Sequence, residues 1–106
     1  MNILGIDIGT TTVTALVLST DKSEILKSCT LKNDSFINGR DFEKLQDPSI
    51  IIETVKSAVK NVTESLNVDA IGITGQMHGI LYLDGSYKPC SPLMIWQDER
   101  GNEYIS

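Results

Sequence analysis

The chain has 106 residues, of which 41% are hydrophobic and 22% are charged, a composition typical of a globular protein. A chain of this length buries one modest core, so we expect one domain or part of one. The formal net charge of -5 argues against nucleic acid as a partner, because phosphate neutralisation needs clustered lysine and arginine. No apolar run reaches the roughly 20 residues that span a bilayer, and residues 1–3 lack the basic start of a secretory signal. We therefore expect a soluble, cytoplasmic protein without a membrane partner.

The two cysteines, Cys29 and Cys90, lie far apart in the sequence and form no Cys-x-x-Cys pair. No cluster of histidines accompanies them. We expect ordinary reduced side chains, with neither a zinc site nor a disulfide framework.

The first quarter of the chain carries two short apolar runs, at residues 3–8 and 13–18. They predict two β-strands joined by a hairpin rich in glycine and threonine. Weaker alternation from Glu24 to Leu31 predicts a third strand in the same antiparallel unit. The segment Asn33–Gln46 is polar with scattered aromatics and no clear period, which indicates a loop.

A helix start follows at Asp47 and Pro48, because aspartate can accept orphan amide N–H groups and proline is tolerated at the first helical position. Apolar residues then recur at helical spacing and predict an amphipathic helix that packs on the sheet. The stripe consists of Ile51, Val55, Ala58, Val62 and Leu66.

After the helix, the apolar run Val68–Thr74 predicts a parallel strand reached by a helical crossover. Two further strands are expected at Ile80–Leu83 and Leu93–Trp96, with a turn at residues 84–86 between them. The order β-β-β-α-β-β-β predicts an α/β fold with a mixed sheet.

One candidate site lies at the tip of the first hairpin, in Asp7, Gly9, Thr10, Thr11 and Thr12. A glycine lets a phosphate approach the backbone, and successive N–H groups and hydroxyls can donate to its oxygens. An acid at a strand end can organise Mg²⁺ through water. Taken alone, the same residues also suit a plain hairpin connection.

A second candidate site is the glycine-flanked tip with Gln76, Met77 and His78, whose polar atoms could bind hydroxyl groups. A structural histidine is the alternative reading. In the third segment, Trp96 could be a core residue, and Asp98 with Arg100 could be an exposed charge cluster or a helix start.

Taken together and in this order, the three segments resemble the FGGY carbohydrate kinases, a family of the actin, Hsp70 and hexokinase superfamily with a ribonuclease H-like fold. The resemblance runs from Asp7 to Arg100. Gly-Gln-Met-His-Gly at 75–79 and Trp-Gln-Asp at 96–98 look most like the xylulokinase and sedoheptulokinase branch. Glycerol kinases usually carry Asn-Gln-Arg-Glu at the tip.

The resemblance implies ATP and Mg²⁺ as cofactors, and transfer of the ATP γ-phosphoryl group to a hydroxyl of a ketose or polyol. Asp7 would face the Mg²⁺-bound phosphates through water, and Gly9 with Thr10, Thr11 and Thr12 would line them. Gln76 would support the turn that carries the sugar contacts, and Trp96 would form an apolar wall. The positions assigned to the substrate are Gln76, Met77, His78, Trp96 and Asp98.

Residues 1–106 would then be the sugar-binding side of a partial, truncated N-terminal FGGY domain, without the C-terminal ATP-binding domain. The family's aspartate base would lie beyond Ser106, so we expect no catalytic residue in this chain and no turnover by it alone. The full-length protein could form a homodimer. A non-catalytic sugar-binding remnant and an actin-like regulatory or assembly module are the alternatives.

Two positions depart from the family pattern. Thr14 stands where the family often has a basic residue that could reach phosphate, and Glu99 replaces a common glycine. The first departure bears on nucleotide affinity, and the second on local backbone and charge.

Overall fold

The computed structural model describes residues 1–39, 43–76 and 79–97. The chain divides into two compact units. The first comprises Met1–Asp34 and Ile52–Gln76, and the second comprises Ser35–Ile51 together with the described residues from 79 onward. Within the described residues, no helix is both long and apolar enough to cross a membrane.

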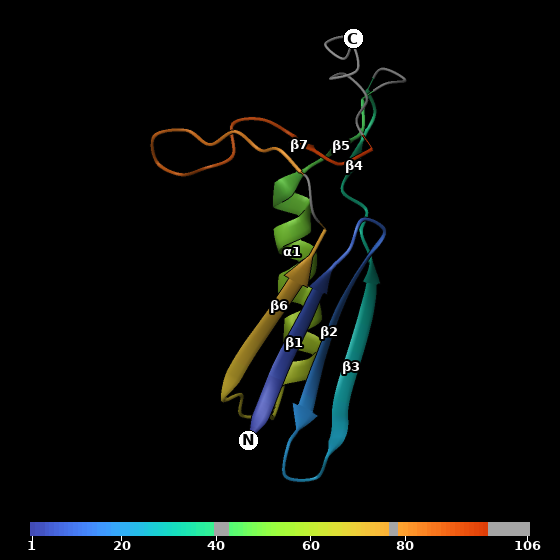
Figure 1. Cartoon of the computed structure of the whole chain (residues 1–106), viewed down its shortest axis with the longest axis vertical. Helices are drawn as coiled ribbons and strands as arrows, with labels where there is room; N and C mark the ends of the chain where they lie inside the picture. Colours follow the sequence, from blue (N-terminus) through green and yellow to red (C-terminus); the bar gives the residue numbers. More distant parts are fainter. Residues whose placement is uncertain (40–42, 77–78, 98–106) are drawn as a thin grey trace. The chain divides into compact units, whose positions relative to one another are not determined.

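A four-stranded mixed sheet with the order β3-β2-β1-β6 forms the first unit. Its strands are β1 (Asn2–Ile8), β2 (Thr12–Ser19), β3 (Glu24–Lys32) and β6 (Ala70–Gly75). β2 pairs antiparallel with both β1 and β3, whereas β6 pairs parallel with β1. Figure 1 shows the arrowheads of β1 and β6 pointing the same way. The predicted antiparallel unit and the parallel strand after a helical crossover are both confirmed.

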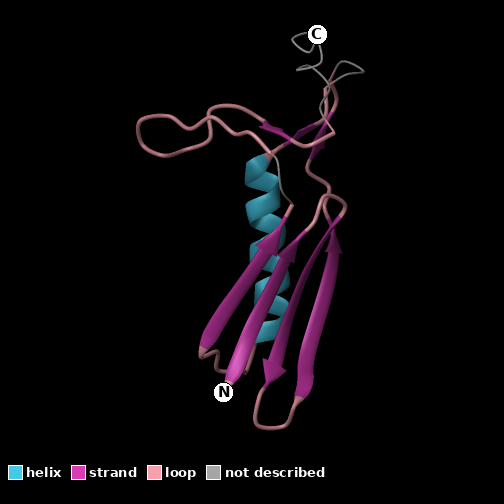
Figure 2. Ribbon diagram, viewed as in Figure 1, coloured by secondary structure: helices cyan, strands magenta, loops and turns pink. Residues whose placement is uncertain are grey.

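Helix α1 (Pro48–Thr63) covers one face of this sheet, as Figure 2 shows. Alternate residues of β1 and β2 point toward it, because successive side chains of a strand face opposite ways. They form the core with Ala58 and Val62 of the helix. The strand residues of this core are Leu4, Ile6, Val13, Ala15 and Val17.

The helix begins as predicted and ends earlier than predicted. The Asp47 carboxylate accepts hydrogen bonds from the Ser49 hydroxyl at 2.7 Å and the Ser49 N–H at 2.9 Å. These two bonds hold the pKa of Asp47 below its ordinary value. At the other end, Ser65 adopts a φ of 65°, a left-handed conformation that cannot continue the helix. Leu66 therefore lies outside the helix, although it packs against the core.

The second unit carries a small sheet that the sequence did not predict. It has the order β4-β5-β7, from β4 (Phe36–Ile37), β5 (Leu45–Gln46) and β7 (Leu93–Met94). The predicted loop Asn33–Gln46 thus contributes two strands of two residues each. Such strands are too short to show alternation, and β5 finds its partner β7 far along the chain.

The predicted strand Ile80–Leu83 is wrong. Only isolated bridges join Ile80 to Met94 and Leu83 to Pro89. Proline has no N–H to donate to a continuing ladder, which accounts for the interruption at Pro89. The strand expected at Leu93–Trp96 is limited to Leu93–Met94, so Trp96 lies outside it. The turn at residues 84–86 is present, with the Asp84 carboxylate accepting from the Ser86 N–H at 2.8 Å.

A matched pair of substitutions tests this account of the core. Leu4 and Ile71 are register partners, yet Leu4 is 3% exposed and Ile71 is 62% exposed. We expect Leu4→Ala to lower the free energy of unfolding by about 2–5 kcal/mol, because it removes buried methyl groups and leaves a cavity. Ile71→Ala should change it far less. Urea denaturation measures both values, and equal losses would show that α1 does not shield Leu4 as described.

Candidate functional site

The carboxyl ends of β1 and β6 meet at one edge of the first unit. Because the two strands are parallel, Asp7 is the register partner of Thr74, and Ile8 is the partner of Gly75. The Gln76 N–H continues the pairing by donating to the Ile8 carbonyl at 3.0 Å. Gln76, the residue directly after β6, therefore lies beside the end of β1.

A tight turn at Gly9–Thr12 connects β1 to β2. The Gly9 N–H donates to the Thr12 carbonyl at 2.9 Å. A Cβ atom on Gly9 would lie 2.9 Å from the Thr12 carbonyl oxygen, closer than such atoms approach. The turn itself therefore requires glycine at position 9, before any ligand is considered.

The first candidate site is linked directly to the second. The Thr10 hydroxyl donates to the side-chain oxygen Oε1 of Gln76 at 3.0 Å. This bond joins residues 66 positions apart, and it lies partly buried. The structure thus brings together one residue predicted to bind phosphate and one predicted to support the sugar side.

Asn33, which follows β3, is a residue of this site that sequence reasoning missed. Its side-chain Nδ2 donates to the Gly9 carbonyl at 2.9 Å, and its backbone N–H donates to the Thr11 carbonyl at 2.8 Å. The only signal in the sequence is a polar residue close behind the predicted strand Glu24–Leu31. The polar stretch that begins at Asn33 instead indicated a loop.

Asp7 faces the side of the sheet opposite to α1, together with its register partner Thr14 on β2. Within the described part of the chain its carboxylate makes no hydrogen bond or ion pair. The Thr14 hydroxyl lies 2.9 Å from the Thr30 hydroxyl, so it is engaged with β3. A basic side chain at position 14 would lie next to Asp7, its register partner on β1.

A shallow hollow of about 430 Å³ runs along this face beside Asp7. Two glycines that are register partners, Gly5 and Gly72, help to form it, because neither has a side chain to fill the space. Thr14 and Thr74 also line it. The hollow leads from the middle of the sheet to the carboxylate at the strand end.

The residues predicted to bind the sugar do not all belong to one unit. Gln76 belongs to the first unit, and Trp96, which is 57% exposed, belongs to the second. Met77, His78 and Asp98 lie outside the described residues, as does Glu99. Their predicted roles remain predictions.

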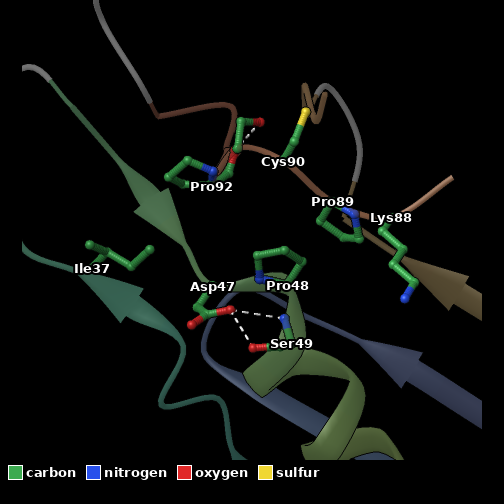
Figure 3. Close-up of a pocket in the computed structure, with 9 residues that line it drawn as sticks. Ile37, Asp47, Pro48, Ser49, Lys88, Pro89, Cys90 and Pro92 are labelled. Atoms are coloured by element: carbon green, nitrogen blue, oxygen red, sulfur yellow. Dashed lines mark hydrogen bonds between the residues drawn. The ribbon is translucent and has the colours of Figure 1, made fainter. Parts of the chain in front are cut away.

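The second unit contains a pocket of about 620 Å³, shown in Figure 3. Ile37 and the segments 47–49 and 88–92 line it. Its polar groups at Asp47 and Ser49 are already bonded to each other at the helix start. None of the predicted site residues within the described ranges borders this pocket.

The described residues contain no group of three or more histidine, cysteine or carboxylate side chains placed to hold a metal ion. Asp7 is therefore not part of such a group among the described residues.

Two glycine substitutions distinguish the turn from the open sheet face. We expect Gly9→Ala to lower the free energy of unfolding by about 1–3 kcal/mol, because the backbone around Thr12 must shift. Gly72→Ala meets no atom within 4 Å. It should be neutral or stabilising by about 0.5–1 kcal/mol, since alanine loses less backbone entropy. Urea denaturation provides the comparison, and a Gly9→Ala variant as stable as Gly72→Ala would contradict the described turn.

Residues 2–106 match the family described as FGGY family of carbohydrate kinases, N-terminal domain. The chain is 32% identical over 100 residues to a xylulose kinase of Klebsiella pneumoniae, which covers 92% of this chain and 20% of that protein. The fold matches a ligand-bound xylulose kinase from Lactobacillus acidophilus with a TM-score of 0.87 at 20% identity, over 97% of this chain and 21% of the other. It also matches a Plasmodium falciparum glycerol kinase solved with ADP, with a TM-score of 0.86 at 21% identity, over 97% and 22%.

The chain spans about a fifth of the length of these proteins. The expected fold is confirmed, because the structural neighbours are sugar kinases. The match covers all of the chain but its first residue. The chain therefore belongs to the FGGY family of carbohydrate kinases.

Proposed function

We propose that this chain is the sugar-side N-terminal part of an ATP-dependent kinase that phosphorylates a hydroxyl of a ketose or polyol. The observation that carries the proposal is the junction of the two strand ends. There, the turn after β1 and the residue after β6 share the bond between Thr10 and Gln76. Phosphoryl transfer depends on holding the phosphate and the acceptor hydroxyl in line. The turn and Gln76, which are adjacent at one edge of the sheet, would serve that purpose.

On the phosphate side, we assign the backbone of Gly9–Thr12 and the exposed hydroxyls of Thr11 and Thr12 to the nucleotide phosphates. Asp7, whose carboxylate is unengaged among the described residues, would hold Mg²⁺ through water. The Thr10 hydroxyl is already donated to Gln76, so we assign it to linking the turn with β6. Bound Mg²⁺-ATP would supply the transferable phosphoryl group. A glycerol kinase solved with ADP supports nucleotide binding by this fold.

On the sugar side, Met77 and His78 would contact the substrate, and Gln76 would support their turn. Trp96 would form an apolar wall, and Asp98 would contribute near it. Because several matching proteins are xylulose kinases, xylulose is the first ketose to test. Sedoheptulose is the second, from the resemblance of the Gly-Gln-Met-His-Gly tip.

We propose that the chain does not turn over alone. Asp7 is poorly suited as the base that accepts the proton of the sugar hydroxyl. Beside Mg²⁺-bound phosphates, its carboxylate would stay ionised and interact with the cation instead. The base and the adenosine contacts would belong to the remaining four-fifths of a protein as long as its relatives. Such a protein would act in the cytoplasm, where ATP is available, and could form a homodimer.

A chimera tests the proposal. This chain would replace the matching segment of the Klebsiella pneumoniae xylulose kinase, and ADP formation would be followed with ATP, Mg²⁺ and a panel of ketoses and polyols. We expect sugar-dependent ADP formation by the chimera and none by the chain alone. In the chimera, His78→Ala should raise the sugar KM by about tenfold, equivalent to about 1.4 kcal/mol, because a hydroxyl contact is lost. Ser57→Ala, on the exposed side of α1, is the control.

A folded chimera that forms no ADP with any sugar would contradict the proposal and favour a non-catalytic or assembly module. ADP formation by the chain alone would contradict its predicted inactivity. If His78→Ala lowered only the melting temperature, the histidine would be structural rather than a sugar contact.

A further inference from the structure

We propose that Asn33 is a positioning residue that fixes the β1–β2 turn in the conformation needed to bind a phosphate. The inference rests on the proposed function of that turn. It concerns a residue outside the three segments that carry the family resemblance. Its support comes from burial, two hydrogen bonds and the geometry of the peptide group.

Asn33 is 2% exposed, and its side-chain amide is therefore almost wholly removed from water. A buried amide costs free energy unless its polar atoms are hydrogen-bonded. Here the side-chain Nδ2 donates to the Gly9 carbonyl at 2.9 Å, and the backbone N–H donates to the Thr11 carbonyl at 2.8 Å. One residue thus holds two carbonyl groups of the turn, at alternate positions.

Because the peptide group is planar, these two hydrogen bonds also fix the direction of the N–H groups of Thr10 and Thr12. In a trans peptide, the N–H of the next residue points opposite to the carbonyl. The peptide bonds of residues 9–12, like those of the other described residues, are trans. With the Gly9 and Thr11 carbonyls directed toward Asn33, the N–H groups of Thr10 and Thr12 point to the other side of the turn.

Backbone N–H groups that are not engaged within the protein can attract an anion, whereas carbonyl oxygens would repel a phosphate. The Gly9 and Thr11 carbonyls are engaged by Asn33, and the Thr12 carbonyl accepts from the Gly9 N–H. Through its side chain, Asn33 therefore holds the Gly9 carbonyl on the side opposite to the Thr10 N–H.

A purely structural role is the competing explanation. However, β1 and β2 already pair continuously from Asn2 with Ser19 to Ile8 with Val13. That ladder holds the hairpin together below the turn. The side-chain bond of Asn33 acts beyond the ladder, on the peptide group of Gly9, which is where a ligand would be bound.

Titration of the ¹⁵N-labelled chain with inorganic tripolyphosphate and Mg²⁺ tests the inference, with binding read from the amide resonances of residues 10–12. We expect Asn33→Ala to weaken binding at these amides by about tenfold, equivalent to about 1.4 kcal/mol. Asn67→Ala is the matched control, because Asn67 is exposed and its described bond uses only its backbone carbonyl. Its affinity should stay within twofold of the unmodified chain, a difference of about 0.4 kcal/mol.

Equal affinities of Asn33→Ala and Asn67→Ala, with both variants folded by circular dichroism, would overturn the inference. Should Asn33→Ala not fold, Asn33→Ser takes its place, because its short hydroxyl cannot reach the Gly9 carbonyl. A stability loss without weaker binding would assign Asn33 to structure alone.

If the unmodified chain shows no shift at residues 10–12, the proposed phosphate site itself fails. A second measurement on the unmodified chain then tests the hydrogen bond from the Asn33 side chain to the Gly9 carbonyl separately. The side-chain amide protons of Asn33 should exchange with solvent more slowly than those of Asn67. Equal exchange rates would show that this hydrogen bond does not hold the turn, and would overturn the inference.

Discussion

The parallel pairing of β1 with β6 is the constraint on which the rest of this structure depends. It places residues that are more than sixty positions apart at the same edge of one sheet, because the carboxyl ends of parallel strands coincide. Without it, the Gly-Thr-rich turn would be an ordinary hairpin tip, and Gln76 would not lie beside it. The candidate site exists because these two ends meet.

The crossover helix makes this pairing possible. Parallel neighbours need a connection that returns to the starting edge, and α1 provides it while burying the apolar face of β1 and β2. The opposite face carries Asp7 and Thr14, with the two paired glycines behind them. Packing and site are thus assigned to opposite faces by the simple alternation of side chains along a strand.

The elements that the sequence predicts well are those with a long periodic signal. β1, β2, β3 and α1 each extend over seven or more residues, so their patterns exceed chance variation. β4, β5 and β7 have two residues each and depend on distant partners. The end of α1 depends on the φ of Ser65, and the break at Ile80–Leu83 depends on pairing with Pro89. Neither feature has a periodic signature.

The candidate site divides in the same way. Residue types alone point to the turn at Gly9–Thr12, since glycine and hydroxyls at a strand end suit phosphate. They do not show that Gly9 is required by the Thr12 carbonyl or that Asn33 holds the turn from behind. Both contacts exist only in the folded chain, where the residue that follows β3, Asn33, lies beside the turn.

The structure gives Thr10 a contact that the sequence does not predict. Its hydroxyl donates to Gln76. Thr10, which is predicted to line a phosphate, is therefore also part of the junction between the turn and Gln76.

A double-mutant cycle on this contact tests the central claim that the two strand ends form one unit. Thr10→Val, Gln76→Leu and the double variant would be compared in urea denaturation. If the bond joins the two ends, the two losses in unfolding free energy should be non-additive, with a coupling of about 0.5–1.5 kcal/mol. Losses that add to within about 0.3 kcal/mol would contradict the account, because independent segments share no interaction energy.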